Sequence, residues 1–105
     1  MANYLLLYHG GGAPEGAEAQ AQVMDDWTKW FGSLGAAVVD GGNPTGVAKT
    51  VSSDGSVSDG GGSNPVTGYS VITADNLDAA VEMAKGCPHV TSGGSIEVAE
   101  TFAVM

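Results

Sequence analysis

The chain has 105 residues, enough for a single domain spanning residues 1–105. Its 12 acidic residues face three lysines and no arginine, and the net charge of −9 argues against nucleic-acid binding, which needs cations to neutralise phosphates. A lone cysteine allows neither an internal disulfide nor a thiolate metal cage, and this fits a reducing compartment.

The first predicted element is an apolar strand over residues 3–9. Alternation puts Leu5 and Leu7 on one face and Tyr4, Leu6 and Tyr8 on the other, so both faces need cover. The run is too short for a signal or membrane segment, and we therefore expect a cytoplasmic protein with no membrane partner. The glycine-rich loop at 10–14 lacks the spacing of phosphate-binding loops, so no nucleotide site is predicted.

Helical periodicity predicts an α-helix over residues 17–34, followed by Gly35 as a stop signal. The helix carries one wide apolar stripe, formed by Val23, Trp27, Trp30, Phe31 and Leu34. Its two tryptophans have two interpretations: they fill the space between helix and sheet, or they line a ligand cavity.

A short strand is predicted at 36–40, and strands at 47–53 and 56–58 flank the hairpin dipeptide Asp54-Gly55. Residues 54–64 are expected at the periphery, because they are rich in Gly, Ser and Asp. The central strand, at 69–73, leads to a second helix with Asp75 as N-cap. Gly86 ends that helix, Pro88 lies in the loop that follows it, and the last strand spans 96–102.

Four local motifs in this order resemble the YCII-related family, which includes DGPF-domain proteins. The motifs are Tyr4-Leu5-Leu6-Leu7-Tyr8; Val57-Ser58-Asp59-Gly60; Gly68-Tyr69-Ser70-Val71-Ile72 with the helix start at 75–80; and Gly86-Cys87-Pro88 with Gly94-Ser95-Ile96-Glu97-Val98. The resemblance implies an α+β fold: a ferredoxin-like subunit, with an antiparallel sheet and two helices on one face, that pairs into a homodimeric α+β barrel. An uncovered apolar sheet face independently favours a homodimer.

The chain departs from that family at positions that bear on activity. Gly61 and Gly62 stand where the signature has Pro and Phe, the first helix carries no histidine, and Cys87 stands where an aspartate precedes the proline. The acid/base pair suspected in some members is therefore not carried over to this chain.

The candidate catalytic residues are His9, at the end of the first strand, and His89, in the loop after the second helix. Each is either a general base, since histidine titrates near neutral pH, or a structural loop residue. The two histidines lack metal-ligand spacing, so no metal site and no cofactor are predicted. The candidate ligand-binding residues are Trp27, Trp30, Tyr69, Asp40 and Glu97.

Two functions of different class remain open. The first is a cofactor-independent lyase or isomerase acting on a small organic acid, in a pocket walled by Trp27, Trp30 and Tyr69, with His9 preferred over His89 as the proton-transfer group. The alternative is a non-catalytic dimeric module that binds a small apolar ligand or a protein partner. A pocket beneath the first helix, against the central strand, is expected in either case if the chain binds a ligand.

Overall fold

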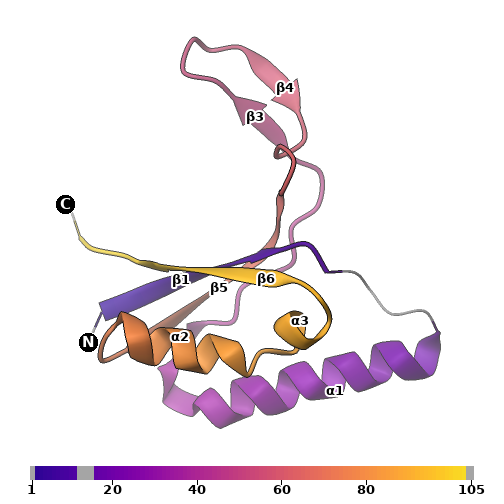
Figure 1. Cartoon of the computed structure of the whole chain (residues 1–105), viewed down its shortest axis with the longest axis vertical. Helices are drawn as coiled ribbons and strands as arrows, with labels where there is room; N and C mark the ends of the chain where they lie inside the picture. Colours follow the sequence, from indigo (N-terminus) through magenta and orange to yellow (C-terminus); the bar gives the residue numbers. More distant parts are fainter. Residues whose placement is uncertain (1, 12–15, 104–105) are drawn as a thin grey trace.

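The computed structural model describes residues 2–11 and 16–103 of the chain (Figure 1). Residues 12–14 of the predicted glycine loop fall outside this description. In chain order the elements are β1 (Ala2–His9), α1 (Ala17–Leu34), the 3-10 turn η1 (Gly35–Ala37), β2 (Val38–Asp40), β3 (Lys49–Val51), β4 (Val57–Asp59), β5 (Val66–Ala74), α2 (Leu77–Lys85), α3 (Pro88–Thr91) and β6 (Ser95–Glu100).

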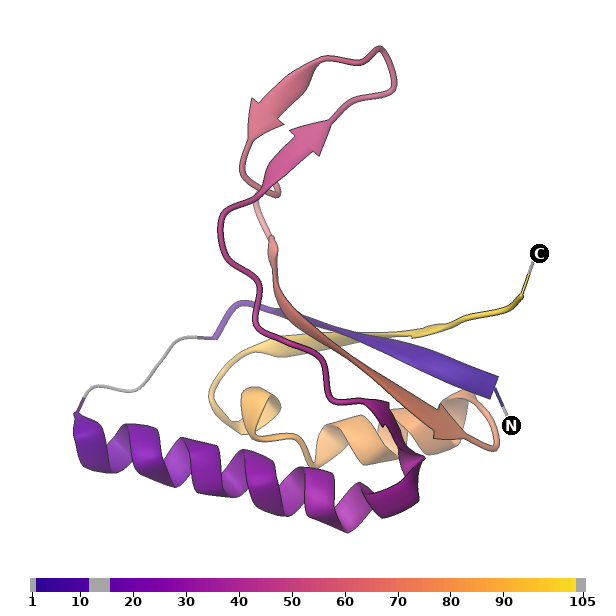
Figure 2. The same cartoon turned by 180° about the vertical axis from the view of Figure 1, so that it is seen from behind.

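An antiparallel sheet in the order β2-β5-β1-β6 forms the centre of the protein. β1 lies between β5 and β6, with Leu6 opposite Ser70 on one side and Val98 on the other. The helices lie together on one face of this sheet, as both cartoon views show (Figures 1 and 2). The α+β class is as predicted, and the arrangement is compatible with a ferredoxin-like subunit.

The core lies between the sheet and the helices. Tyr4, Leu6 and Tyr8 of β1 are buried on this side, whereas Leu5 and Leu7 are half-buried on the opposite face. This confirms the alternation predicted for the strand. The remaining buried apolar residues come from both helices, from β5 and from the turn after α2: Trp30, Ile72, Ala74, Ala80, Ala84 and Cys87.

The helix boundaries largely follow the sequence signals. α1 has the predicted limits, and Gly35 ends it with φ 54°. The predicted cap of α2 is wrong by one residue: the Asn76 side chain, and not Asp75, accepts a hydrogen bond of 2.8 Å from the Ala79 amide. Pro88 does not lie in a loop but opens α3, because a proline at the first helical position loses no intrahelical hydrogen bond.

The strands in the middle of the chain differ more from their predicted limits. β3 and β4 are three residues each and pair only with one another, and β5 begins earlier than the predicted 69–73. β6 ends at Glu100, two residues before the predicted limit. Residues 45–65, which we call the arm, carry β3 and β4 away from the sheet on the side opposite the helices (Figures 1 and 2). Within the arm, residues 54–64 are exposed apart from half-buried Gly60, as predicted.

Gly42 holds the loop after β2 against the central strand. Its φ is 74°, and a Cβ atom added there would overlap the carbonyl oxygen of Tyr69. The neighbouring Gly41 has open space around the same position. Only the second of these two glycines is therefore required by the close approach of the two backbones.

We expect Gly42→Ala to lower the free energy of unfolding by about 1–3 kcal/mol, because it adds both backbone strain and a clash. Gly41→Ala is the matched control and should change it by less than about 0.5 kcal/mol. Urea denaturation followed by circular dichroism measures both variants. Equal effects of the two substitutions would contradict the close approach described for Gly42.

Candidate functional site

A cavity of about 450 Å³ lies between α1, the loop after β2 and the first half of β5. α1 supplies one wall, and β1 and α3 contribute one residue each. The lining residues are Tyr8, Met24, Trp27, Phe31, Gly41, Gly42, Asn43, Pro44, Thr67, Gly68, Tyr69, Ser70 and His89. None of these side chains is a lysine, an arginine or a carboxylate.

Trp27 lies at the centre of the aromatic wall. Its ring meets Tyr8 edge-on at a centroid distance of 5.3 Å and lies 5.7 Å from Phe31. Such edge-on and tilted contacts are favoured by the ring quadrupoles and limit how each ring can turn. The helix therefore presents a fixed, largely apolar surface to the cavity.

The polar groups on the strand side are already paired. The Tyr8 hydroxyl donates to Ser70 Oγ at 2.7 Å, and Ser70 Oγ donates to the carbonyl oxygen of Gly41, also at 2.7 Å. Burial raises the pKa of Tyr8 to about 12, so the phenol is neutral at physiological pH. This hydrogen-bond chain joins β1, β5 and the loop after β2, and it leaves few free polar groups on the wall.

His89 is the one histidine among the residues that line the cavity. Its Nε2 lies 2.8 Å from the carbonyl oxygen of His9, and because a carbonyl only accepts, Nε2 carries the proton. In the neutral ring Nδ1 is then the basic nitrogen, and no hydrogen bond joins it to any described residue. Added Cβ atoms on Gly11 and Gly94 would collide with the ring, so these two glycines leave it the space it occupies.

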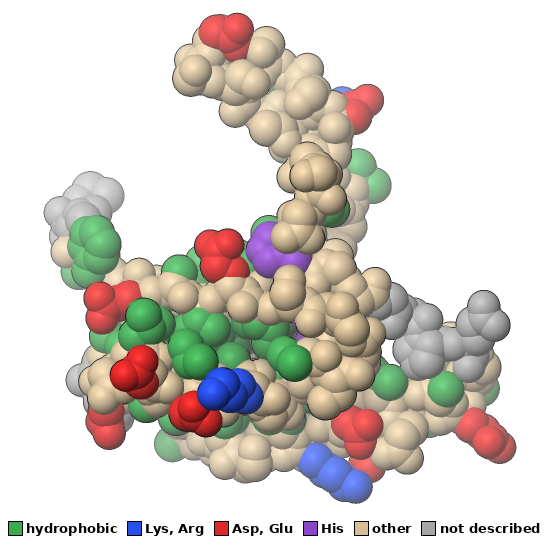
Figure 3. Space-filling model, viewed as in Figure 1, with side chains coloured by type: hydrophobic (Ala, Val, Ile, Leu, Met, Phe, Trp, Pro, Cys, Tyr) green, Lys and Arg blue, Asp and Glu red, His purple; other side chains and the backbone are tan. Residues whose placement is uncertain are grey.

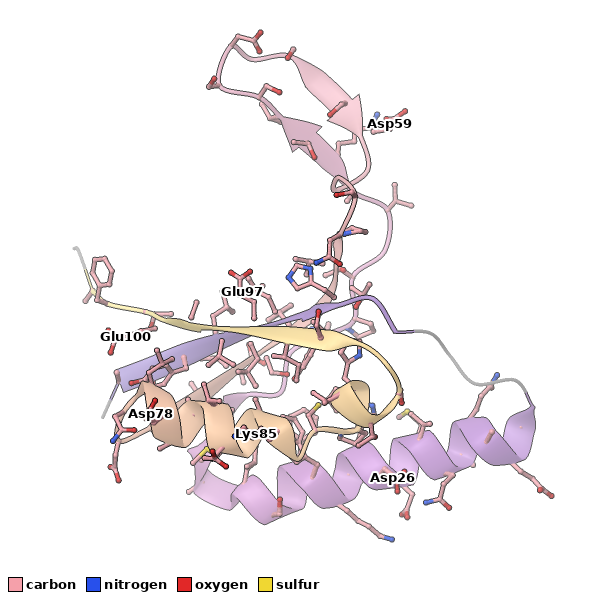
Figure 4. All side chains as sticks on the ribbon, in the orientation of Figure 1. Asp26, Asp59, Asp78, Lys85, Glu97 and Glu100 are labelled. Atoms are coloured by element: carbon pink, nitrogen blue, oxygen red, sulfur yellow. The ribbon has the colours of Figure 1, made fainter. Side chains whose placement is uncertain are left out.

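His9 lies on the other face of the sheet and does not line the cavity. Its Nδ1 donates to the carbonyl oxygen of Asn64 at 2.9 Å. Its Nε2 is buried without a hydrogen-bond partner among the described residues, 4.0 Å from Glu97 Oε1. Glu97 stands on the side of β6 that faces away from the helices (Figure 4). The sequence-based preference for His9 as the cavity histidine is therefore wrong, and His89 takes that position.

Trp30 agrees with the first of the two interpretations of the tryptophans, since it fills core space and does not line the cavity. Its indole Nε1 donates to the carbonyl oxygen of Met83 at 3.0 Å, and the side chain is only 6% exposed, packed in the core. It borders a separate surface depression of about 440 Å³ beside Lys29 and Pro88. Of the two tryptophans, Trp27 lines the cavity beneath α1 and Trp30 joins the two helices.

Tyr69 is among the lining residues of the cavity, whereas Asp40 does not line it and acts on the adjoining loop through its side chain. Tyr69 pairs with Leu7, so its side chain shares the helix-free face with that leucine. Asp40 Oδ1 accepts a hydrogen bond of 2.9 Å from the Gly42 amide and orders the loop. The sequence-based site omitted Tyr8, Met24 and Ser70. For Tyr8 and Ser70 the signal was present, since strand alternation places them on the same face as Leu6 and Ile72.

The face seen in Figure 3 carries more acidic than basic side chains. Lys29, Lys49 and Lys85 each lie 2.8–2.9 Å from a carboxylate. Within residues 2–11 and 16–103 no cluster of three or more His, Cys, Asp or Glu side chains is arranged to hold a metal ion. No helix in that same part of the chain has the length and apolar character needed to cross a membrane.

No protein-family model matches this chain, and no curated protein matches it in sequence. The resemblance to the YCII-related family therefore stays a prediction. The acid/base pair suspected in some members of that family has no counterpart in the cavity, whose lining includes one histidine, His89, and no carboxylate.

Stability should fall at alkaline pH because of two buried acids. Burial raises the pKa of Cys87 from 9.0 to about 11 and that of Tyr8 from 10.0 to about 12. As pH rises, the unfolded chain loses these two protons before the folded chain does. The contribution of the two protonated groups to the free energy of unfolding is therefore complete below about pH 9 and is lost as pH rises towards 12. Urea unfolding at about pH 8, 10 and 11 should show this decline.

Tyr8→Phe and Cys87→Ala each remove one of the two groups and should make the decline shallower. The quantity to compare is the slope of the free energy of unfolding against pH, because both substitutions also change packing or hydrogen bonding and so shift the free energy at every pH. If neither variant alters this slope, the alkaline decline does not come from Tyr8 and Cys87.

Proposed function

We propose that the protein binds a small, uncharged and largely apolar molecule in the cavity beneath α1. The observation that carries this proposal is the cavity wall, built from Trp27, Phe31, Met24 and Tyr8 without a charged side chain. A volume of about 450 Å³ falls in the range of small-molecule sites. It suits a molecule of about one or two rings.

The polar groups of the wall favour a neutral ligand over an acid. Tyr8 and Ser70 use their donors within the protein, and each lysine is paired with a carboxylate. A carboxylate entering the cavity would lose hydration without gaining a cation, which is costly in an apolar site. A small organic acid is therefore supported less well than a neutral aromatic compound.

Binding can be tested with neutral indole and naphthol and with their carboxylate analogues. We expect the neutral compounds to change tryptophan fluorescence with dissociation constants below about 1 mM, and the carboxylates to bind at least about tenfold more weakly. Trp30→Phe, which leaves Trp27 as the reporter, should keep the signal. Trp27→Phe should lose most of it.

A response in Trp27→Phe equal to that of Trp30→Phe would place binding outside the cavity. Equal affinity for the neutral and charged compounds would contradict the proposed ligand class.

A second candidate function is cofactor-independent proton transfer by His89 on a bound carbonyl compound. It is supported by the hydrogen bond from Nε2 to the His9 carbonyl, which leaves Nδ1 as the basic nitrogen. Nδ1 would take a proton from the carbon next to a carbonyl group and return it, as in an isomerisation. The lyase or isomerase hypothesis on a small acid takes this form, with His89 in the role first given to His9.

This candidate predicts exchange of the C3 protons of a small 2-oxo acid, and of its neutral methyl ester, for deuterium in D₂O, followed by NMR. His89→Asn should reduce any protein-dependent exchange by at least about 100-fold. His9→Asn is the control and should retain it, since His9 lies on the other sheet face. No exchange above the buffer rate, or exchange that survives His89→Asn, would contradict the proposed role of His89 in proton transfer.

We also propose that two copies pair through the helix-free face of the sheet. Half-buried Leu5, Leu7, Val71 and Ala99 lie on this face, and no described helix covers it. A sheet face of this composition is normally packed against a second layer. Homodimerisation would supply that layer, as in the predicted α+β barrel.

A further inference from the structure

The protein exposes more surface than a compact chain of its size. Its accessible area is 6825 Å² for a mass of 10.5 kDa, whereas a compact monomer of this mass exposes roughly 5,400 Å². Its radius of gyration is 15.1 Å, against roughly 13 Å for a compact chain of this length. The arm, which stands clear of the rest of the fold, is the main visible cause (Figures 1 and 2).

The arm carries apolar side chains that nothing in the described chain covers. Val47, Val51 and Val57 are 102%, 68% and 59% exposed. Val51 and Val57 face each other across the two-stranded ladder of β3 and β4. Because an isolated pair of short strands is marginally stable in water, an arm of this kind gains from packing against another surface.

The arm stands on the same side of the sheet as the uncovered apolar face (Figures 1 and 2). The chain beyond β6 turns to this side as well, and there Phe102 is 80% exposed. The space-filling view shows a hollow between the arm, the sheet and this end of the chain (Figure 3). A second sheet stacked on the open face, at the usual spacing of about 10 Å, would lie beside the arm.

We infer that the arm is a clasp for a second copy of this chain, with Val51 and Val57 packed on the partner's surface. The inference rests on the homodimer proposed above and adds a second contact region to its sheet face. In a two-fold dimer each arm holds the opposite subunit, so one apolar contact is formed twice.

The excess area fits such an interface. The chain exposes roughly 1,400 Å² more than a compact monomer, and a standard interface buries about 800 Å² on each partner. Burying half of this excess accessible area would approach the area that a standard interface buries on each partner. The base of the arm is also fixed to the sheet, because His9 Nδ1 donates to Asn64 and the Thr45 amide donates to the Thr67 carbonyl.

The experiment compares the double variant Val51→Thr/Val57→Thr with Val90→Thr by sedimentation equilibrium. Threonine keeps the strand preference of the arm while removing its apolar surface. Val90 is the matched control, since it is 40% exposed on α3 in the helical layer. We expect a wild-type dimer at micromolar concentration, a dissociation constant raised at least about tenfold by the double variant, and no change for Val90→Thr.

Hydrogen exchange on the wild-type protein gives a test that needs no folded variant. Diluting across the dimer midpoint should speed amide exchange in the arm and in β1 together. A wild-type monomer at about 100 μM would overturn both the dimer and the clasp. A dimer unaffected by the double variant, with arm exchange independent of concentration, would overturn the clasp while leaving the sheet-face dimer intact.

Discussion

The whole architecture depends on a sheet whose helices all lie on one face. Tyr4, Leu6 and Tyr8 of β1 are buried under those helices, while Leu5 and Leu7 of the same strand look the other way. One face therefore has a complete core and a cavity at its margin. The other carries apolar side chains that no layer formed by residues 2–11 and 16–103 covers. The proposed ligand site and the proposed dimer surface thus lie on the two sides of a single strand.

The chemistry of the cavity follows from polar groups that satisfy one another. Tyr8, Ser70 and the Gly41 carbonyl form a closed hydrogen-bond chain, and Asp40 is engaged by the Gly42 amide. A ligand that brought its own hydrogen-bond requirements would have to break these contacts, and leaving buried polar groups unpaired carries a free-energy cost of about 1–3 kcal/mol each. The proposed selectivity for a neutral, flat molecule therefore rests on the pairing of polar groups within the wall as well as on its aromatic rings.

Local periodicity predicted the helix at 17–34 and the two faces of β1, because both depend on residues near in sequence. The site required information that periodicity lacks. Trp27 and Trp30 belong to one stripe, and the Met83 carbonyl, 53 residues away, decides which of them joins the core. His89 is positioned by the His9 carbonyl, 80 residues away.

The position of His9 could have been predicted from the sequence, because strand alternation puts the side chains of Tyr8 and His9 on opposite faces of the sheet. Asp75 and Asn76 are both residue types that cap helices well, so the sequence does not decide between them. The backbone geometry of the structure makes Asn76 the N-cap of α2.

The central position of β1 has a consequence for how the chain is made. β1 leaves the ribosome before β5 and β6, the two strands with which it pairs, and Tyr4 pairs with Glu100, 96 residues later in the chain. The sheet therefore cannot be completed until β6 has been synthesised, and contacts between residues this distant in sequence slow folding. Until then β1 presents unpaired edges rich in leucine and tyrosine, a hazard for aggregation. The nascent chain would be most vulnerable to aggregation or to chaperone capture during that interval.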